Sequence, residues 1–270
     1  MKFLVKKVFF FALPLFFAAC ISDDESEDIE PWNAEAVCPA EGTNAYGMPN
    51  RGTFTDERDG QVYRYTTIGD QVWMAENLRY DAPYSTCSND TGFIRQYCEL
   101  IEHNCKSETC CRESLCRNFG RYYSIIENGN RFGLIDTILA DTTCPKGWHI
   151  PTKGEWEKLE EMMTSSEESK VSTVSRMKSS DSTYFSMSST QINKFNRTNV
   201  GTDDCALSII PSGFMYEDGM TIEFNAAFLS STQKNKNFMY AVETGNSINY
   251  ISNVYRNSIR CVMDPVNPEL

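Results

Sequence analysis

The chain has 270 residues, 41% of them hydrophobic, and a formal net charge of -12 at neutral pH. That hydrophobic content can fill a folded core, so the chain as a whole is not a disordered tail. A strongly acidic surface repels phosphate backbones, so the charge excludes nucleic acid as an expected partner.

The N-terminus has the pattern of an export signal. Three lysines precede an apolar run, Val8 to Ala19, and residues 17–20 read Phe-Ala-Ala-Cys. As a helix the run spans about 18 Å, less than the roughly 30 Å bilayer core, so we expect a cleaved signal peptide at residues 1–19. The motif resembles a bacterial lipobox, which implies acylation of Cys20, for example by palmitate. An ordinary signal peptide with an incidental cysteine is the alternative.

Residues 20–53 are expected to hold the lipidated cysteine, an acidic tether and a loop. Residues 22–30 contain six acidic residues, and charge of one sign extends a chain by self-repulsion. This run also resembles surface-export signals of some Gram-negative bacteria. We therefore expect an exported outer-membrane lipoprotein displayed on the cell surface, with membrane contact through its lipid.

Residues 61–78 predict a β-hairpin. Tyr, Thr, Val and Ile dominate both halves, and Gly69-Asp70 lies between them. A two-residue hairpin turn needs positive φ, which glycine adopts without strain.

Six of the eleven cysteines lie between residues 87 and 116. Without Cys20 ten cysteines remain, an even number that full pairing needs, and such a content is typical of an oxidising compartment. The segment lacks apolar periodicity, so we expect bridges to order it, in a connectivity that the sequence does not choose. Zinc is disfavoured because no CxxC pair occurs. These cysteines are Cys87, Cys98, Cys105, Cys110, Cys111 and Cys116.

A capping box predicts a helix after residue 152. Thr152 and Glu155 have the Thr-x-x-Glu spacing in which each side chain satisfies a backbone N–H of the other. Trp156 and Leu159 then recur at helical spacing, so the helix should run from near Lys153 to near Met163. A polar excursion is expected at residues 165–199.

The last third of the chain predicts antiparallel strands. Short apolar runs alternate with Gly- and Asn-containing turns, at residues 206–211, 214–216, 227–231, 238–242, 248–251 and 259–263. One or two helices followed by many strands indicate an α+β fold.

Six motifs carry a resemblance to a known family. They are DGQVYRYTTIGDQVWMAENLRY, CPKGWHIPTKGEWEKL, GTDD, SGFMYEDG, FLSST and SIRCV, in that order. Together they resemble the Fibrobacter succinogenes major paralogous domain over residues 54–264, with 87–116 as a cysteine-rich insertion. That family resembles the C-type-lectin-like fold shared with formylglycine-generating enzymes, which implies an irregular, disulfide-stapled antiparallel sheet with one or two helices. The resemblance also implies a bridge between Cys144 and Cys261. If residues 87–116 pair internally, Cys38 and Cys205 remain for each other.

No catalytic set is recognisable. His149 is interpreted as structural, and no G-x-S-x-G motif occurs. Asp203-Asp204 and Glu217-Asp218 are carboxylate pairs of the kind a hydrolase uses, but both lie in turn-like contexts. Asp203, Asp204 and Asp218 are also candidate ligands for calcium; no other cofactor or metal is expected.

Aromatic residues divide into two expected groups. Three tryptophans lie in motifs typical of a core, and four tyrosines in the variable strands are candidates for an exposed patch. They are Trp73, Trp148 and Trp156, and Tyr216, Tyr240, Tyr250 and Tyr255.

The sequence favours a surface-displayed, lectin-like binding or adhesion module for glycans or extracellular protein, without enzymatic activity. A secreted enzyme, either an acid-pair hydrolase or a formylglycine-generating relative, and a structural envelope component without a ligand are the alternatives.

Overall fold

The computed structural model describes most of the chain after residue 31: residues 32–100, 102–126, 134–164, 170–182, 200–216, 221–222, 226–235, 238–243, 249–252 and 255–265. Every described residue belongs to one compact unit, Pro31–Leu270. The predicted signal peptide, Cys20 and the acidic tether therefore lie outside the described residues. Among the described helices, none has the length and hydropathy needed to span a bilayer.

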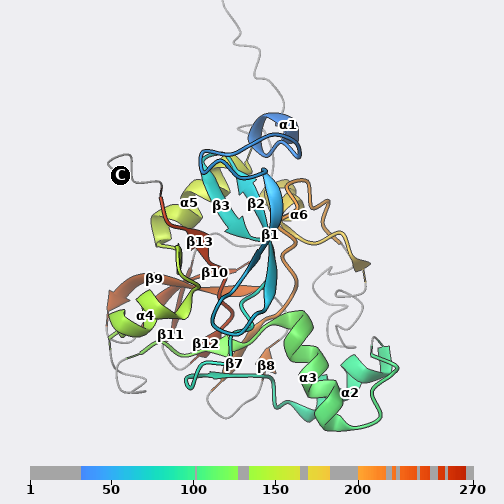
Figure 1. Cartoon of the computed structure of the whole chain (residues 1–270). Helices are drawn as coiled ribbons and strands as arrows, with labels where there is room; N and C mark the ends of the chain where they lie inside the picture. The colour runs from blue at the N-terminus through green and yellow to red at the C-terminus, as the bar shows by residue number, and fades with distance from the viewer. Residues whose placement is uncertain are drawn as a thin grey trace, which may run out of the picture. The chain divides into compact units, whose positions relative to one another are not determined.

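Antiparallel strands form three sheets (Figure 1). The first has the order β1-β2-β3-β13-β6 and comprises Arg51–Thr55, Val62–Ile68, Gln71–Met74, Val262–Met263 and Trp148–His149. The second has the order β11-β10-β9 and comprises Asn249–Ser252, Phe238–Glu243 and Ala227–Asn235. The third has the order β4-β5-β12-β7-β8 and comprises Ser85–Thr86, Tyr122–Tyr123, Tyr255–Asn257, Phe214–Tyr216 and Thr221–Ile222.

Helices accompany these sheets, which confirms the predicted α+β class. The described part of the chain contains six, more than the one or two expected: α1 Ala34–Val37, α2 Thr91–Leu100, α3 Glu108–Phe119, α4 Thr137–Thr143, α5 Lys153–Met162 and α6 Lys170–Met177. Figure 1 shows α2 and α3 at the lower right, at the opposite end of the view from α5.

The predicted hairpin is confirmed as β2 and β3. Ile68 pairs with Gln71 across the turn, and Gly69 has a φ of 57°. A Cβ at Gly69 would also approach the sulfur of Met162 on α5, a flexible side chain that can move aside. The backbone conformation is therefore what favours glycine there.

The predicted helix is confirmed as α5, and both halves of its capping box are present. The Oγ1 atom of Thr152 accepts the Glu155 N–H at 3.2 Å, and the Oε2 atom of Glu155 accepts the Thr152 N–H at 2.8 Å. On the inner face Trp156 lies 4.6 Å from Trp73 and 5.4 Å from Phe228 between ring centroids. All three predicted core tryptophans are buried.

The cysteine-rich segment is a helical hairpin, which corrects the expectation that bridges alone order it. Asp90 accepts the Phe93 N–H at 3.0 Å and Ser107 accepts the Cys110 N–H at 3.2 Å, so both helices begin at side-chain caps. Gly120, with a φ of 85°, follows the end of α3. Between the helices lies a separate small core of Phe93, Ile94, Tyr97, Leu115 and Phe119. We call residues 87–120 the cysteine-rich hairpin.

All ten cysteines after Cys20 are paired in the structure. The five bridges are Cys38–Cys205, Cys87–Cys116, Cys98–Cys111, Cys105–Cys110 and Cys144–Cys261. Three close short loops within the cysteine-rich hairpin. The other two join positions 167 and 117 residues apart and are buried, so they connect distant parts of the main body.

Residues 206–211, expected as a strand, form a loop with one bridge from Ile209 to Lys178. The reason is local hydrogen bonding. Asp203 accepts both the N–H and the hydroxyl of Ser208 at 2.7 Å, and this closes a tight turn in which Asp203, Ala206 and Ser208 all have positive φ. Extended pairing is incompatible with three such residues.

Candidate binding site

Three aromatic rings meet on the third sheet. The ring centroids of Phe214 and Tyr255 lie 4.7 Å apart, those of Tyr216 and Tyr255 4.9 Å, and those of Phe214 and Tyr216 5.8 Å. All three side chains are half-buried, so part of each ring faces solvent. We call Phe214, Tyr216 and Tyr255 the aromatic cluster.

Strand alternation explains the cluster. Phe214 and Tyr216 lie two residues apart on β7 and share one face, while Met215 between them is buried. The register places Tyr255 of β12 directly opposite Tyr216. Burial and a hydrogen bond with Tyr216 raise the pKa of the Tyr255 hydroxyl, so both rings are held in a defined arrangement.

A buried amide lies beside the cluster. Asn257 shares its face of β12 with Tyr255 and pairs with Phe214 in the register. It is fully buried, and neither its side-chain nitrogen nor its oxygen has a hydrogen-bond partner. Leaving such a group unpaired costs about 1–3 kcal/mol.

The four candidate tyrosines fall into two cross-strand pairs. Tyr216 lies opposite Tyr255 on the third sheet, and Tyr240 lies opposite Tyr250 between β10 and β11. The side chains of Tyr240 and Tyr250 lie outside the described residues. Phe214 was missed, although its two-residue spacing from Tyr216 is a strand signal that could have identified it.

The carboxylates considered for calcium or for hydrolysis are not gathered into a site among the described residues. Asp203 is engaged by Ser208, and burial raises its pKa against the opposing hydrogen bonds from Ser208. Asp204 lies 3.8 Å from the guanidinium of Arg176. Glu217 and Asp218 lie outside the described residues, and no group of three potential metal ligands occurs within them.

Arg260 is a buried cation that sequence reasoning did not single out. It donates to the side-chain oxygen of Asn77 at 3.0 Å, to the carbonyl of Ser208 at 2.9 Å and to the carbonyl of Leu207. Burial lowers its pKa to about 9, with the negative charge of Asp203 opposing the shift. The guanidinium therefore stays charged at neutral pH and holds the 203–208 loop against the segment at Asn77.

His149 is held between two carboxylates. Its Nδ1 lies 2.7 Å from Asp264 and its Nε2 2.9 Å from Glu155. Burial alone would lower the pKa of His149, but the hydrogen bonds and charges of Glu155 and Asp264 outweigh it and raise that pKa above 6.5. Burial alone would raise the pKa of Glu155, but the hydrogen bonds from His149 and Thr152 outweigh it and lower that pKa below 4.5.

This pairing predicts a pH-dependent stability. The His149 contribution is complete below pH 6.5 and is lost as the pH rises through its raised pKa. The Glu155 contribution is complete above pH 4.5 and is lost as the pH falls through its lowered pKa. His149→Gln should therefore lower the free energy of unfolding by about 1 kcal/mol at about pH 5.5, and by less at about pH 8.

Urea unfolding across this pH range measures the effect. The exposed His103 forms no ion pair with a described carboxylate, so His103→Gln is the control and should change the free energy of unfolding little. Equal pH profiles for the two variants would contradict the assignment.

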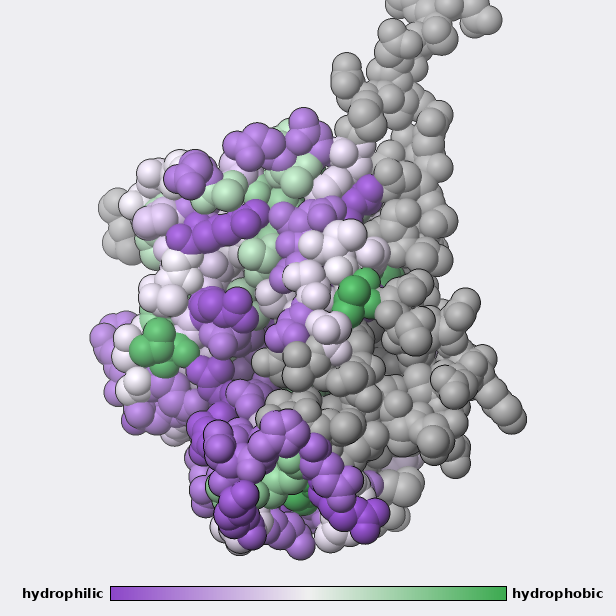
Figure 2. All heavy atoms as spheres, turned by 90° about the vertical axis from the view of Figure 1, so that its right-hand side faces the viewer, coloured by the Kyte–Doolittle hydropathy of each residue, from purple (hydrophilic) through white to green (hydrophobic). Residues whose placement is uncertain are grey.

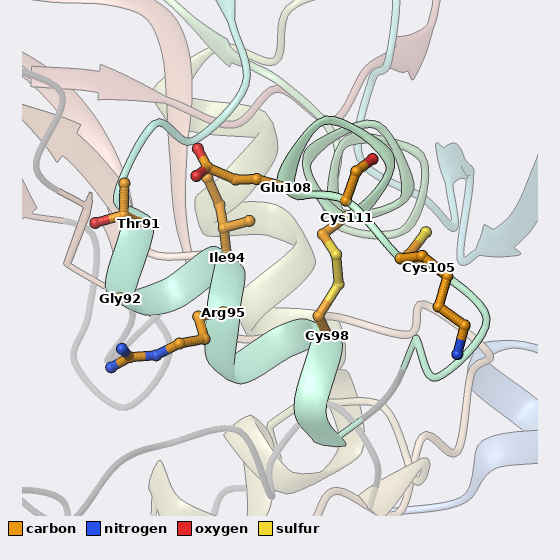
Figure 3. A pocket seen from close by; sticks show the side chains of 10 residues that line it. Thr91, Gly92, Ile94, Arg95, Cys98, Cys105, Glu108 and Cys111 are labelled. Atoms are coloured by element: carbon orange, nitrogen blue, oxygen red, sulfur yellow. A yellow bond between two sulfur atoms is a disulfide. The ribbon is translucent and has the colours of Figure 1, made fainter.

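A cavity of about 480 Å³ opens between α2 and α3. Its lining includes Ile94, Arg95, Cys98, Cys105, Lys106 and Cys111. The Cys98–Cys111 bridge joins the two helices, and Cys105 lies beside it on the loop that leads into α3 (Figure 3). Figure 2 shows mainly hydrophilic surface at the lower part of the molecule, where α2 and α3 lie, around a small hydrophobic area. We call this space the hairpin cavity.

The fold and these sites define a disulfide-rich α+β domain with a partly exposed aromatic cluster and one open cavity at its cysteine-rich hairpin. The family model for the Fibrobacter succinogenes major domain matches residues 66–263, and the chain belongs to that family. No curated protein and no solved structure gives a significant match to the chain.

Proposed function

We propose that the protein is an exported lipoprotein, anchored in the outer membrane through acylated Cys20, that binds glycans at the cell surface. The observation that carries the proposal is the aromatic cluster. Its three half-buried rings come from two rigidly paired strands. Flat rings held in place present a surface on which the apolar face of a sugar stacks with little loss of conformational entropy.

Two further features support the proposal. The five bridges fit an extracellular compartment. The motif at residues 17–20 resembles a lipobox. Likeness of the family to the C-type-lectin-like fold is part of this proposal.

A glycan array probed with the full-length protein tests the function, followed by titration of a binding glycan. We expect Tyr255→Ala to weaken binding about tenfold or more, because truncation removes the ring that takes part in two of the three contacts of the cluster. Tyr255→Phe keeps the ring and should bind within a few-fold of the wild type.

Tyr46→Ala is the matched control, since Tyr46 is another half-buried tyrosine outside the aromatic cluster. It should leave glycan affinity unchanged. The proposal fails if no glycan is bound, or if Tyr255→Ala and Tyr46→Ala bind equally well.

A further inference from the structure

The five disulfides differ in exposure. Cys105–Cys110 is the one bridge in which both cysteines are half-buried rather than buried. In each of the other four at least one sulfur belongs to a buried residue, and both members of Cys38–Cys205 and Cys144–Cys261 are buried. An attacking thiolate must reach a sulfur atom, and the Cys105–Cys110 bridge offers two half-buried cysteines where Cys87–Cys116 and Cys98–Cys111 each offer one.

The two sulfurs of this bridge are not equivalent. Cys105 lines the hairpin cavity, whereas Cys110 does not belong to its lining. Cys110 is the third residue of the twelve-residue helix α3, and its N–H is held by Ser107 at the helix start. The positive end of the helix dipole stabilises a thiolate in the first turn, so Cys110 is the better leaving group and Cys105 the accessible target.

The cavity also carries unpaired positive charge. Arg95 and Lys106 line it, and neither forms an ion pair with a described carboxylate. Glu108, the one acidic residue of the lining, is paired with Arg112 at 2.8 Å. Although the chain has a net charge of -12, the positive charges of Arg95 and Lys106 make the cavity attractive to an anion.

We infer that the hairpin cavity is a thiol–disulfide exchange site for small anionic thiols. The thiolate RS⁻ attacks the Sγ of Cys105, a bond forms between these sulfurs, and the Cys105–Cys110 bond breaks with its electron pair leaving on Cys110. A second thiolate then attacks the mixed disulfide, releasing RSSR and the Cys105 thiolate. Two thiols are oxidised and one protein disulfide is reduced.

Opening this bridge leaves the hairpin in place. The bridge joins residues only five apart, and the Cys98–Cys111 bridge still joins α2 to α3. The ring of Tyr97 packs against Phe119 at 6.1 Å, and its hydroxyl lies 2.8 Å from that of Ser114. The exchange is therefore local and reversible, distinct from unfolding.

Reaction of the full-length native protein with reduced glutathione tests the inference, with alkylation of free thiols and peptide mapping over time. The expected first products are a mixed disulfide at Cys105 and a free thiol at Cys110, formed about tenfold faster than any thiol of the other bridges. The cationic thiol cysteamine should react more slowly than glutathione at equal thiolate concentration.

Two variants sharpen the test. Arg95→Gln/Lys106→Gln should lower the rate with glutathione and leave the rate with cysteamine unchanged or higher. Cys105→Ser/Cys110→Ser should keep the native circular dichroism spectrum and lose the fast phase. The inference is overturned if another bridge opens first, if glutathione adds to Cys110, if all bridges open together, or if the charge variant reacts like the wild type.

Discussion

Removal of the Cys144–Cys261 bridge by Cys144→Ala/Cys261→Ala should lower the free energy of unfolding by about 5 kcal/mol, enough to prevent stable folding. The bridge joins positions 117 residues apart, and both cysteines belong to the main buried cluster. In the chain-entropy model a loop of this length restricts the unfolded chain strongly, whereas a short loop restricts it little.

Cys105→Ala/Cys110→Ala provides the matched control. It also removes two sulfurs, but the bridge that it removes joins residues only five apart. Its loss should be about 2 kcal/mol. Urea unfolding monitored by circular dichroism measures both variants. Equal losses would show that loop length does not determine the contribution of these bridges.

Arg260→Met should lower the free energy of unfolding by about 3–4 kcal/mol. Methionine keeps the unbranched apolar stem of the side chain but lacks the guanidinium, so the acceptors at Asn77, Leu207 and Ser208 lose their donor inside the protein. These acceptors are remote from water, since Arg260 itself is 1% exposed. The 203–208 loop would also lose its connection to Asn77, which donates to the carbonyl of Phe119 at 2.9 Å.

Arg256→Met is the control for this substitution. Arg256 lies on β12, four residues earlier, is half-buried and makes one 3.4 Å hydrogen bond to the carbonyl of Tyr84. Its replacement should cost less than about 1 kcal/mol. The Arg260 assignment is wrong if the two variants unfold at the same urea concentration.

Elements defined by short-range chemistry could be predicted from the sequence. The turn at Gly69 and the capping box of Thr152 and Glu155 involve atoms a few residues apart, and both are present. The cysteine-rich hairpin was missed for a different reason. Its caps at Asp90 and Ser107 and the helical spacing of Phe93, Ile94 and Tyr97 were readable from the sequence, whereas α3 offers few apolar residues besides its cysteines.

The sites depend on long-range placement that no local pattern contains. Arg260 reaches the carbonyl of Ser208, 52 residues away, and His149 reaches Asp264, 115 residues away. The expected strand at 206–211 failed because Asp203 captures Ser208 and turns the chain. The aromatic cluster was partly predictable, since Phe214 and Tyr216 have the two-residue spacing of a strand, but the register that joins Tyr216 to Tyr255 comes from the folded sheet.

We propose that this fold works outside the cytoplasm, held to a membrane by lipid and closed by five disulfides. Mass spectrometry of the protein isolated from its own cells, alkylated without reduction, distinguishes this location from a cytoplasmic one. We expect an N-terminal Cys20 carrying acyl chains, and no alkylated cysteine. A chain that begins at an unprocessed Met1, with its cysteines alkylated, would contradict both the location and the bridged fold.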